Sequence, residues 1–263
     1  QHTSAALAGC YVISLRPVGA HGGIRRAAAA HGARVLALSP WSLQRRDDDA
    51  TRARLRDALQ ADIVIATSPA AVHAAAELSA LSLSNRPAWI AAGAGTAAAL
   101  RRAGIKTVTA PAHMDSDGVL ALPQLHNVRG VAIGLLSAPG GRDLLMPTLT
   151  ARGAQVLRAD VYARVPAMPS SRCLATLRML DAPVWLALSS AGALKRILAC
   201  LPADAIAALH RTRVVAASAR LATIAREAGF GPAIIATDAR PASLIRAAAA
   251  AAGAVVPPHM RMR

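Results

Sequence analysis

The chain has 263 residues, of which 54% are hydrophobic, 17% are charged and only 2% are aromatic. This composition excludes an intrinsically disordered protein, and the longest apolar run, 247–256, is shorter than the ~18 residues that a membrane span needs. Arg and Lys outnumber Asp and Glu by 30 to 14, so the net charge of +16 favours a substrate or partner with many negative charges.

Short runs rich in Val and Ile alternate along the chain with segments of helical period. In chain order, strands are predicted at 10–15, 34–38, 63–66, 89–92, 107–109, 131–136, 155–157, 184–188, 214–217 and 233–236. Helices are predicted at 24–31, 69–80, 96–103, 118–125, 142–152, 191–198, 220–228 and 242–251. This alternation predicts an α/β fold in which parallel sheets carry helices on both faces.

A long-period repeat runs through the chain. Residues 94–105 resemble 219–230 at a spacing of 125, residues 67–70 precede the similar 189–192 by 122, and 22–36 resembles 141–157. The repeat predicts two similar α/β units of roughly 120 residues each, a common domain size.

Two stretches without helical period, 39–44 and 159–166, occupy equivalent places in the two units. We interpret them as linkers, together with the highly charged segment 45–57 and the Pro- and Ser-rich segment 167–171. Two crossings between the units predict that one domain is inserted into the other. The first domain is then discontinuous, 1–40 plus 167–263, and the inserted domain covers 41–166.

The segment 93–98 fits the pattern G-x-G-x-x-A and begins with Gly93 after a predicted strand. Such a turn brings backbone amides close to an anion at the start of a helix. A dinucleotide site also needs an acidic residue at the end of the next strand, and none is found there. We therefore favour anion binding by the amides and Thr96, and an NAD(P)-dependent enzyme remains the alternative.

Several hydroxyl and guanidinium groups follow predicted strands. Serine and threonine side chains there can cap the next helix or contact a ligand at the edge of the sheet, and both interpretations remain open. Arginines in such strand-to-helix loops could bind carboxylates bidentately or lie solvated on the surface. The hydroxyl candidates are Thr67, Ser68, Ser116, Ser189, Ser190 and Ser218, and the arginines are Arg16, Arg142 and Arg220.

Tyr162 is one of only two tyrosines and lies in a predicted linker. Its phenol could donate a proton in a cleft, or it could pack against a domain edge. Cys10, Cys173 and Cys200 form no C-x-x-C pair, so we interpret them as buried residues in a reducing compartment. The histidines show no metal-binding spacing, and no metal site is expected. No nucleic-acid module is found either.

From Tyr11 to about Ala251 the chain resembles the uroporphyrinogen-III synthase family. The resemblance lies in an ordered series of segments that includes ISLRP (13–17), ATSPAAV (66–72), AAGAGTAAALRRAGI (91–105), DSDGVLALPQL (115–125), GGRDLL (140–145), VYARVP (161–166), ALSSAGAL (187–194) and ASARLATIAREAGF (217–230). It implies two flavodoxin-like domains, a two-stranded connector and an active site in the cleft between the domains.

The implied reaction cyclises hydroxymethylbilane, a linear tetrapyrrole with eight carboxylates, to uroporphyrinogen III with inversion of ring D and loss of water. The resemblance implies no cofactor and no metal, and it makes Tyr162 the candidate for assisting the departure of the hydroxyl. The substrate-binding candidates are then Arg16, Thr67, Ser68, Gly93, Thr96, Ser116, Arg142, Ser189, Ser190, Ser218 and Arg220. We expect a cytoplasmic monomeric lyase with transient contact to the preceding deaminase. A non-catalytic binding protein with a two-domain cleft is a further alternative.

Overall fold

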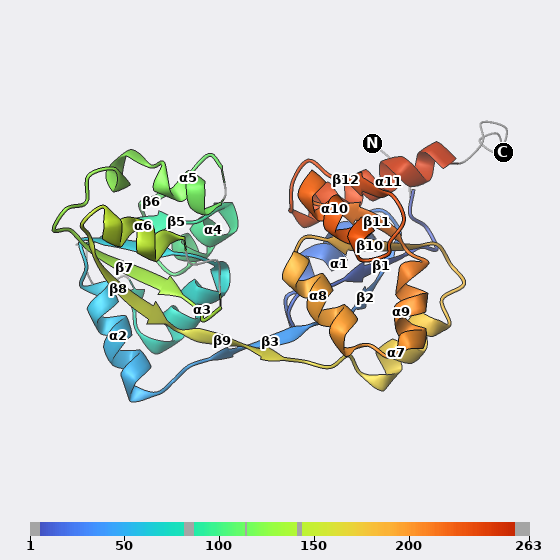
Figure 1. Cartoon of the computed structure of the whole chain (residues 1–263), viewed down its shortest axis with the longest axis horizontal. Helices are drawn as coiled ribbons and strands as arrows, with labels where there is room; N and C mark the ends of the chain where they lie inside the picture. The colour runs from blue at the N-terminus through green and yellow to red at the C-terminus, as the bar shows by residue number, and fades with distance from the viewer. Residues whose placement is uncertain (1–5, 82–86, 114, 141–143, 256–263) are drawn as a thin grey trace. The chain divides into compact units, whose positions relative to one another are not determined.

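The computed structural model describes residues 6–81, 87–113, 115–140 and 144–255, with the chain divided into two compact units. Unit 1 comprises Gln1–Ser42 and Pro166–Arg263, and unit 2 comprises Leu43–Val165. Each unit has its own five-stranded parallel sheet with helices packed on it (Figure 1). The α/β fold class predicted from the alternating pattern is confirmed.

The sheet of unit 1 has the strand order β12-β11-β10-β1-β2. All four neighbouring pairs are parallel, and Tyr11 of β1 lies opposite both Val184 of β10 and Arg34 of β2. The strands are β1 (Tyr11–Ser14), β2 (Arg34–Ala37), β10 (Val184–Leu188), β11 (Arg213–Ala216) and β12 (Ala233–Ile235).

Successive residues of these strands point to opposite faces, and each face has its own core. Ile13 packs with α7–α10, whereas Val12 packs with α1 and α11. Apolar burial on both faces explains why these strands read as continuous hydrophobic runs. The helices are α1 (Gly22–Ala29), α7 (Ser171–Arg178), α8 (Ala191–Cys200), α9 (Ala203–His210), α10 (Ala219–Glu227) and α11 (Pro241–Val255).

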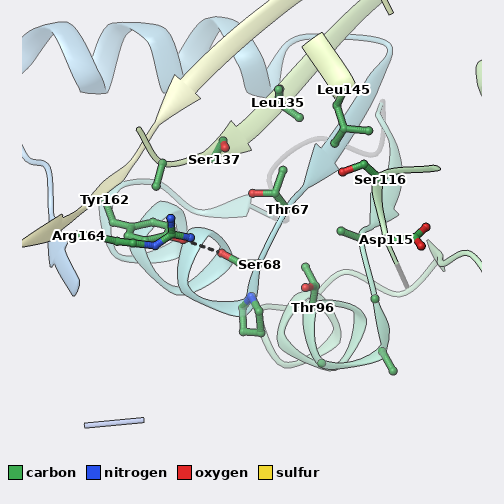
Figure 2. A pocket seen from close by; sticks show the side chains of 16 residues that line it. Thr67, Ser68, Thr96, Asp115, Ser116, Leu135, Ser137, Leu145, Tyr162 and Arg164 are labelled. Carbon is green, nitrogen blue, oxygen red and sulfur yellow. Dashed lines mark hydrogen bonds between the residues drawn. The ribbon is translucent and has the colours of Figure 1, made fainter. Parts of the chain in front are cut away.

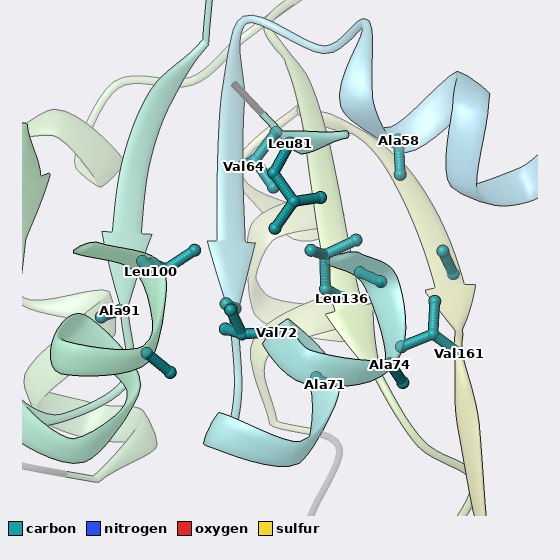
Figure 3. Close-up of a cluster of buried hydrophobic side chains, with 14 of the residues drawn as sticks. Ala58, Val64, Ala71, Val72, Ala74, Leu81, Ala91, Leu100, Leu136 and Val161 are labelled. Atoms are coloured by element: carbon teal, nitrogen blue, oxygen red, sulfur yellow. The ribbon is translucent and has the colours of Figure 1, made fainter. Parts of the chain in front are cut away.

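The sheet of unit 2 has the strand order β6-β5-β4-β7-β8 and is also parallel. One face packs against α2, α3 and α4, where Val64, Val72 and Leu100 belong to one buried cluster (Figure 3). The other face packs against α5 and α6. The elements are α2 (Asp49–Leu59), β4 (Ile63–Ala66), α3 (Pro69–Leu78), β5 (Ala88–Ala91), α4 (Ala94–Arg102), β6 (Val108–Thr109), α5 (Ser116–Leu120), the 3₁₀ helix η2 (Pro123–Leu125), β7 (Ala132–Ser137), α6 (Leu145–Ala151) and β8 (Gln155–Asp160).

The two segments predicted as linkers form a two-stranded sheet of β3 (Trp41–Arg45) and β9 (Tyr162–Pro166). The N–H of Arg46 donates to the carbonyl of Val161, and the N–H of Ala167 donates to the carbonyl of Pro40. Residue numbers therefore rise along one strand as they fall along the other, so the pair is antiparallel.

The two sheets have the same spatial order of strands, but the chain begins at a different strand in each. Unit 1 begins with β1 and β2, whereas the corresponding strands of unit 2, β7 and β8, come last in that unit. The units are thus related by a circular permutation. The predicted repeat is confirmed, because the first residue of α10 comes 125 residues after the first residue of α4, and the same spacing separates their last residues.

The prediction of a charged linker at 45–57 is wrong, because α2 occupies most of that segment. Asp48 caps this helix by accepting a hydrogen bond from the N–H of Thr51 at 2.8 Å. Thr51, Leu55 and Ala58 are buried along one face, so the charged residues between them point to solvent. The segment therefore forms an amphipathic helix in spite of its many charged residues.

Three further differences have local causes. Ser170 caps α7, so the segment predicted as a linker leads directly into a helix. The helix α9 was not predicted and starts after Pro202. The single helix predicted at 118–125 is split into α5 and η2, because Pro123 has no N–H and its ring prevents the helix from continuing.

Candidate active site

The carboxyl end of the unit 2 sheet carries a pocket of about 420 Å³ (Figure 2). Its lining residues follow β4, β5 and β6, belong to or follow β7, or begin the helices after these strands, and Tyr162 and Arg164 of β9 complete it. The chain runs from β4 towards β6 on one side and from β7 to β8 on the other. The pocket therefore lies where the strand order reverses, which is the usual ligand position in open α/β sheets.

Six of the candidates from the sequence line this one pocket: Thr67, Ser68, Gly93, Thr96, Ser116 and Tyr162. They come from four separate segments, yet the parallel strands bring their carboxyl ends to one edge. Arg142 lies outside the described residues. The pocket thus gathers hydroxyl groups and the start of a helix around one space.

The side chains of Tyr162 and Ser68 meet in the pocket. The phenol oxygen of Tyr162 lies 3.1 Å from Oγ of Ser68, and Tyr162 is only 5% exposed. Ser68 also caps α3, because its Oγ accepts a hydrogen bond from the N–H of Ala71 at 3.1 Å. Thr67 beside it donates its hydroxyl to the carbonyl of Leu136. These contacts hold one edge of the pocket in a defined geometry.

The first turn of α4 forms another side of the pocket. The N-cap of α4 is Gly93, in extended backbone with φ −178°, and no side chain caps the helix. Ala94, Gly95 and Thr96 line the pocket at this end. The first N–H groups of a helix lack intrahelical partners and carry positive potential, so this turn suits a carboxylate.

Three polar residues of the pocket were missed in the sequence: Asp115, Ser137 and Arg164. Arg164 is two residues after Tyr162 in an extended strand, so a period of two could have placed both on one face. Ser137 is the last residue of β7, and Thr67 directly follows the neighbouring strand β4, so both hydroxyls lie at the carboxyl end of the sheet. Asp115, not Ser116, is the N-cap of α5 and accepts from the N–H of Gly118 at 2.8 Å; the capping interpretation of Ser116 is wrong.

The other five candidates belong to unit 1. Ser190 and Ser218 cap α8 and α10, each accepting a hydrogen bond from the N–H of the third residue of its helix. Ser189 follows β10 directly and is half-buried. Of the two interpretations left open, capping is confirmed for Ser190 and Ser218, and ligand contact stays a prediction. Both residues follow the carboxyl ends of their strands, β10 and β11.

The two arginines of unit 1 differ in setting. Arg16 lies in the loop after β1 and donates to the carbonyl of Ala239 at 3.4 Å, and burial lowers the pKa of its guanidinium. Arg220 was predicted where a strand-to-helix loop meets the helix 220–228, and it lies exposed in the first turn of α10, which begins at Ala219 after the cap Ser218.

The structure bears on three other expectations from the sequence, which concern metal binding, the cysteines and membrane-spanning helices. Among the described residues, no group of three or more His, Cys, Asp or Glu side chains is arranged to hold a metal ion. The three cysteines are free, with Cys10 buried and the other two only half-buried, so the prediction of full burial is wrong for Cys173 and Cys200. Within the described part of the chain, no helix is long and apolar enough to cross a membrane.

Comparison with known proteins gives a consistent result. The family model described as "Uroporphyrinogen-III synthase HemD" matches residues 23–246. The uroporphyrinogen-III synthase of Salmonella typhimurium is 32% identical over 199 residues, 74% of this chain and 81% of that protein. The Escherichia coli K12 enzyme is 31% identical over 164 residues, 61% of this chain and 66% of that protein.

Two solved structures share the fold. A mutant uroporphyrinogen III synthase from the extremely thermophilic bacterium Thermus thermophilus has a TM-score of 0.62 and 21% identity. The uroporphyrinogen-III synthetase of Helicobacter pylori 26695 has a TM-score of 0.59 and 16% identity. Each comparison covers 93% of this chain and 99% of the solved one.

Proposed function

This chain belongs to the uroporphyrinogen-III synthase family, and from that premise we propose that it cyclises hydroxymethylbilane to uroporphyrinogen III with inversion of ring D. The observation that carries the proposal is the unit 2 pocket, where the phenol of Tyr162 meets Ser68 beside the uncapped start of α4. A proton donor and a carboxylate-binding turn share one space there.

The substrate's chemistry fits this pocket. Its carboxylates suit the first N–H groups of α4 and the guanidinium of Arg164, since both attract negative charge. The hydroxyls of Thr96 and Ser137 add neutral donors, whereas the hydroxyl of Thr67, which donates to the carbonyl of Leu136, can only accept. The net charge of +16 supports the same class of substrate over the whole molecule.

In the proposed reaction Tyr162 acts as a general acid. Its phenol donates a proton to the substrate hydroxyl, the carbon–oxygen bond breaks, and water departs, so that an azafulvenium cation forms at the end of the linear chain. The substituted carbon of ring D attacks this centre to give a spiro intermediate, and rearrangement closes the macrocycle as the type III isomer. The phenolate regains a proton during these steps, so the net change is the loss of one water.

The protein's main contribution is then geometric. Without a catalyst, hydroxymethylbilane closes to the symmetric type I isomer, because the free carbon of ring D reacts first. Holding the chain so that the substituted carbon meets the azafulvene selects the other product. Orientation of this kind can contribute up to roughly 7–11 kcal/mol.

The finer parts of the proposal follow from the same resemblance. We assign the reaction to the cyclising hydro-lyases, with no cofactor, in a cytoplasmic monomer that meets the preceding deaminase transiently. The three free cysteines support a reducing compartment. The candidates Arg16, Ser189, Ser190, Ser218 and Arg220 are proposed to bind substrate carboxylates from unit 1, as Arg142 is from unit 2.

A coupled assay tests the proposed function. Hydroxymethylbilane is generated in situ by a deaminase, the products are oxidised, and the porphyrin isomers are separated by chromatography. We expect the type III isomer to dominate, with a reaction lacking the protein as the control. If the type I isomer is the sole product and forms at the spontaneous rate, the result contradicts the proposal and favours a binding protein.

A further inference from the structure

Ser68 makes two hydrogen bonds through a single oxygen. Its Oγ accepts from the N–H of Ala71 at 3.1 Å and lies 3.1 Å from the phenol oxygen of Tyr162. The second contact joins residues 94 positions apart in the sequence, so the cap of α3 reaches a side chain of β9 (Figure 2). Capping the helix requires only the first of these bonds.

We propose that Ser68 is a positioning residue that directs the phenol proton of Tyr162 towards the substrate. The inference rests on the proposed function and deepens it. A hydroxyl that already accepts a hydrogen bond becomes a better donor, because the bonds in a chain polarise one another. With Ala71 donating to Ser68, the preferred direction is for Ser68 to donate to the phenol oxygen, which leaves the phenol O–H free to turn into the pocket.

The same arrangement assists the proton transfer. When Tyr162 gives its proton to the substrate hydroxyl, the carbon–oxygen bond breaks, water departs, and the phenol oxygen becomes negative. The O–H of Ser68 then donates to a full charge, which is a stronger bond than the neutral one before it. The start of α3 behind Ser68 carries positive potential and acts in the same direction. The phenolate then recovers a proton from the azafulvenium N–H, and the hydrogen bond between the neutral side chains of Tyr162 and Ser68 is restored.

The chain offers a matched control for the capping role. Ser170 caps α7 with the same kind of hydrogen bond, its Oγ accepting from the N–H of Cys173 at 3.2 Å, and it is exposed in unit 1. Ser68→Ala and Ser170→Ala therefore each remove one serine cap. Both are expected to lower the melting temperature, and only Ser68→Ala is expected to change turnover.

The test combines these variants with Tyr162→Phe in the isomer assay. Ser68→Ala should lower kcat about three- to tenfold, the change that one neutral hydrogen bond is worth, and leave KM unchanged. In the Tyr162→Phe background the same substitution should have little further effect, because the group that it positions is gone. Ser68→Thr keeps the hydroxyl and should recover most of the rate.

Three results would overturn the inference. A rise in KM with unchanged kcat would make Ser68 a substrate contact, and an equal loss in both tyrosine backgrounds would make its effect independent of Tyr162. Equal losses of activity in Ser68→Ala and Ser170→Ala would reduce the effect to stability. The unaltered protein provides the internal reference: if it forms no type III isomer, the proposed function itself fails.

Discussion

A buried imidazole joins three segments of unit 1. The Nδ1 of His21 lies 2.9 Å from the hydroxyl of Ser14, and its Nε2 lies 2.8 Å from the hydroxyl of Ser39. His21 and Ser14 are buried, at 5% and 1% exposure. Burial, with the nearby charges of Arg25 and Arg16, lowers the pKa of His21. The neutral ring therefore ties the end of β1 to the start of α1 and the loop after β2.

This arrangement predicts a loss of stability in mild acid. In the unfolded chain His21 takes up a proton near its ordinary pKa of about 6.5, whereas the folded protein resists protonation until a lower pH. The free energy of unfolding should therefore fall as the pH drops below about 6.5 and be unaffected by this residue above it. Urea unfolding at pH 7.5 and 5.5 measures the effect, and His21→Gln, which does not titrate, should show a smaller pH dependence. An identical change in the free energy of unfolding between the two pH values for both proteins would contradict the prediction.

The phenol oxygen of Tyr162 is the atom on which the proposed chemistry depends. Tyr162→Phe should lower kcat by up to about 10²-fold, the low end for a general acid, because the substrate also loses its hydroxyl unaided in water. The type III isomer should still dominate, since the substitution does not alter how the substrate is held. Tyr11→Phe is the control, because Tyr11 starts β1 and stacks on Arg34 in unit 1. Unaltered activity of Tyr162→Phe would remove this residue from the mechanism.

At the scale of elements, α5 depends on its surroundings. Its five residues are too few for a helix to be stable alone. Nη1 of Arg152 donates to the carbonyls of Leu120 and Leu125, at 2.8 and 2.7 Å, and so joins the end of α6 to α5 and η2. Gly118 allows a close approach, since a Cβ there would lie 1.9 Å from the carbonyl oxygen of His113. These contacts place Ser116 at the pocket.

Arg152→Met should therefore affect both stability and substrate binding. It removes two hydrogen bonds from a half-buried guanidinium, and we expect the free energy of unfolding to fall by about 2 kcal/mol. Because α5 then loosens, KM should rise more than kcat falls. Chemical denaturation and steady-state kinetics measure the two effects, with Arg54→Met, an exposed arginine of α2, removing the same charge. A stability loss without any change in KM would mean that α5 is held by other contacts.

At the scale of the whole molecule, the excess of positive charge acts on a polycarboxylate substrate. Basic residues exceed acidic ones by 30 to 14, and the ion pairs among the described residues, such as Arg178 with Asp204, engage only some of the arginines. The remaining field attracts anions over a distance that salt shortens, from about 30 Å at 0.01 M to about 10 Å at 0.1 M.

Substrate capture should therefore depend on ionic strength. Raising KCl from 0.02 to 0.5 M should lower kcat/KM by about tenfold through a higher KM, because long-range attraction is screened. The value of kcat should change little, since the bound substrate is already in contact with the protein. Kinetics at fixed pH over this range check the prediction. A flat kcat/KM would show that the net charge of +16 does not serve the substrate.

Features that arise between close neighbours in the chain could be predicted from the amino-acid sequence. Strand β4 was predicted to the residue, and capping by Ser68, Ser190 and Ser218 was one of two interpretations of these serines, because capping involves residues three positions apart. The repeat at a spacing of 125 was also visible. The helix α2 was not predicted although its signals are local, because charged residues outnumber the buried positions Thr51, Leu55 and Ala58 that mark its apolar face.

Which distant segments of the chain come into contact could not be predicted in this way, because it depends on how the sheets assemble. The strand order of unit 2 puts β7 beside β4, so Ser137 joins the pocket with Thr67 although the two are far apart in the sequence. The contact between Ser68 and Tyr162 depends in the same way on β9 returning to the edge of that sheet. Capping and periodicity are short-range effects that any segment displays alone, whereas a pocket at the ends of parallel strands exists only after the sheet has formed.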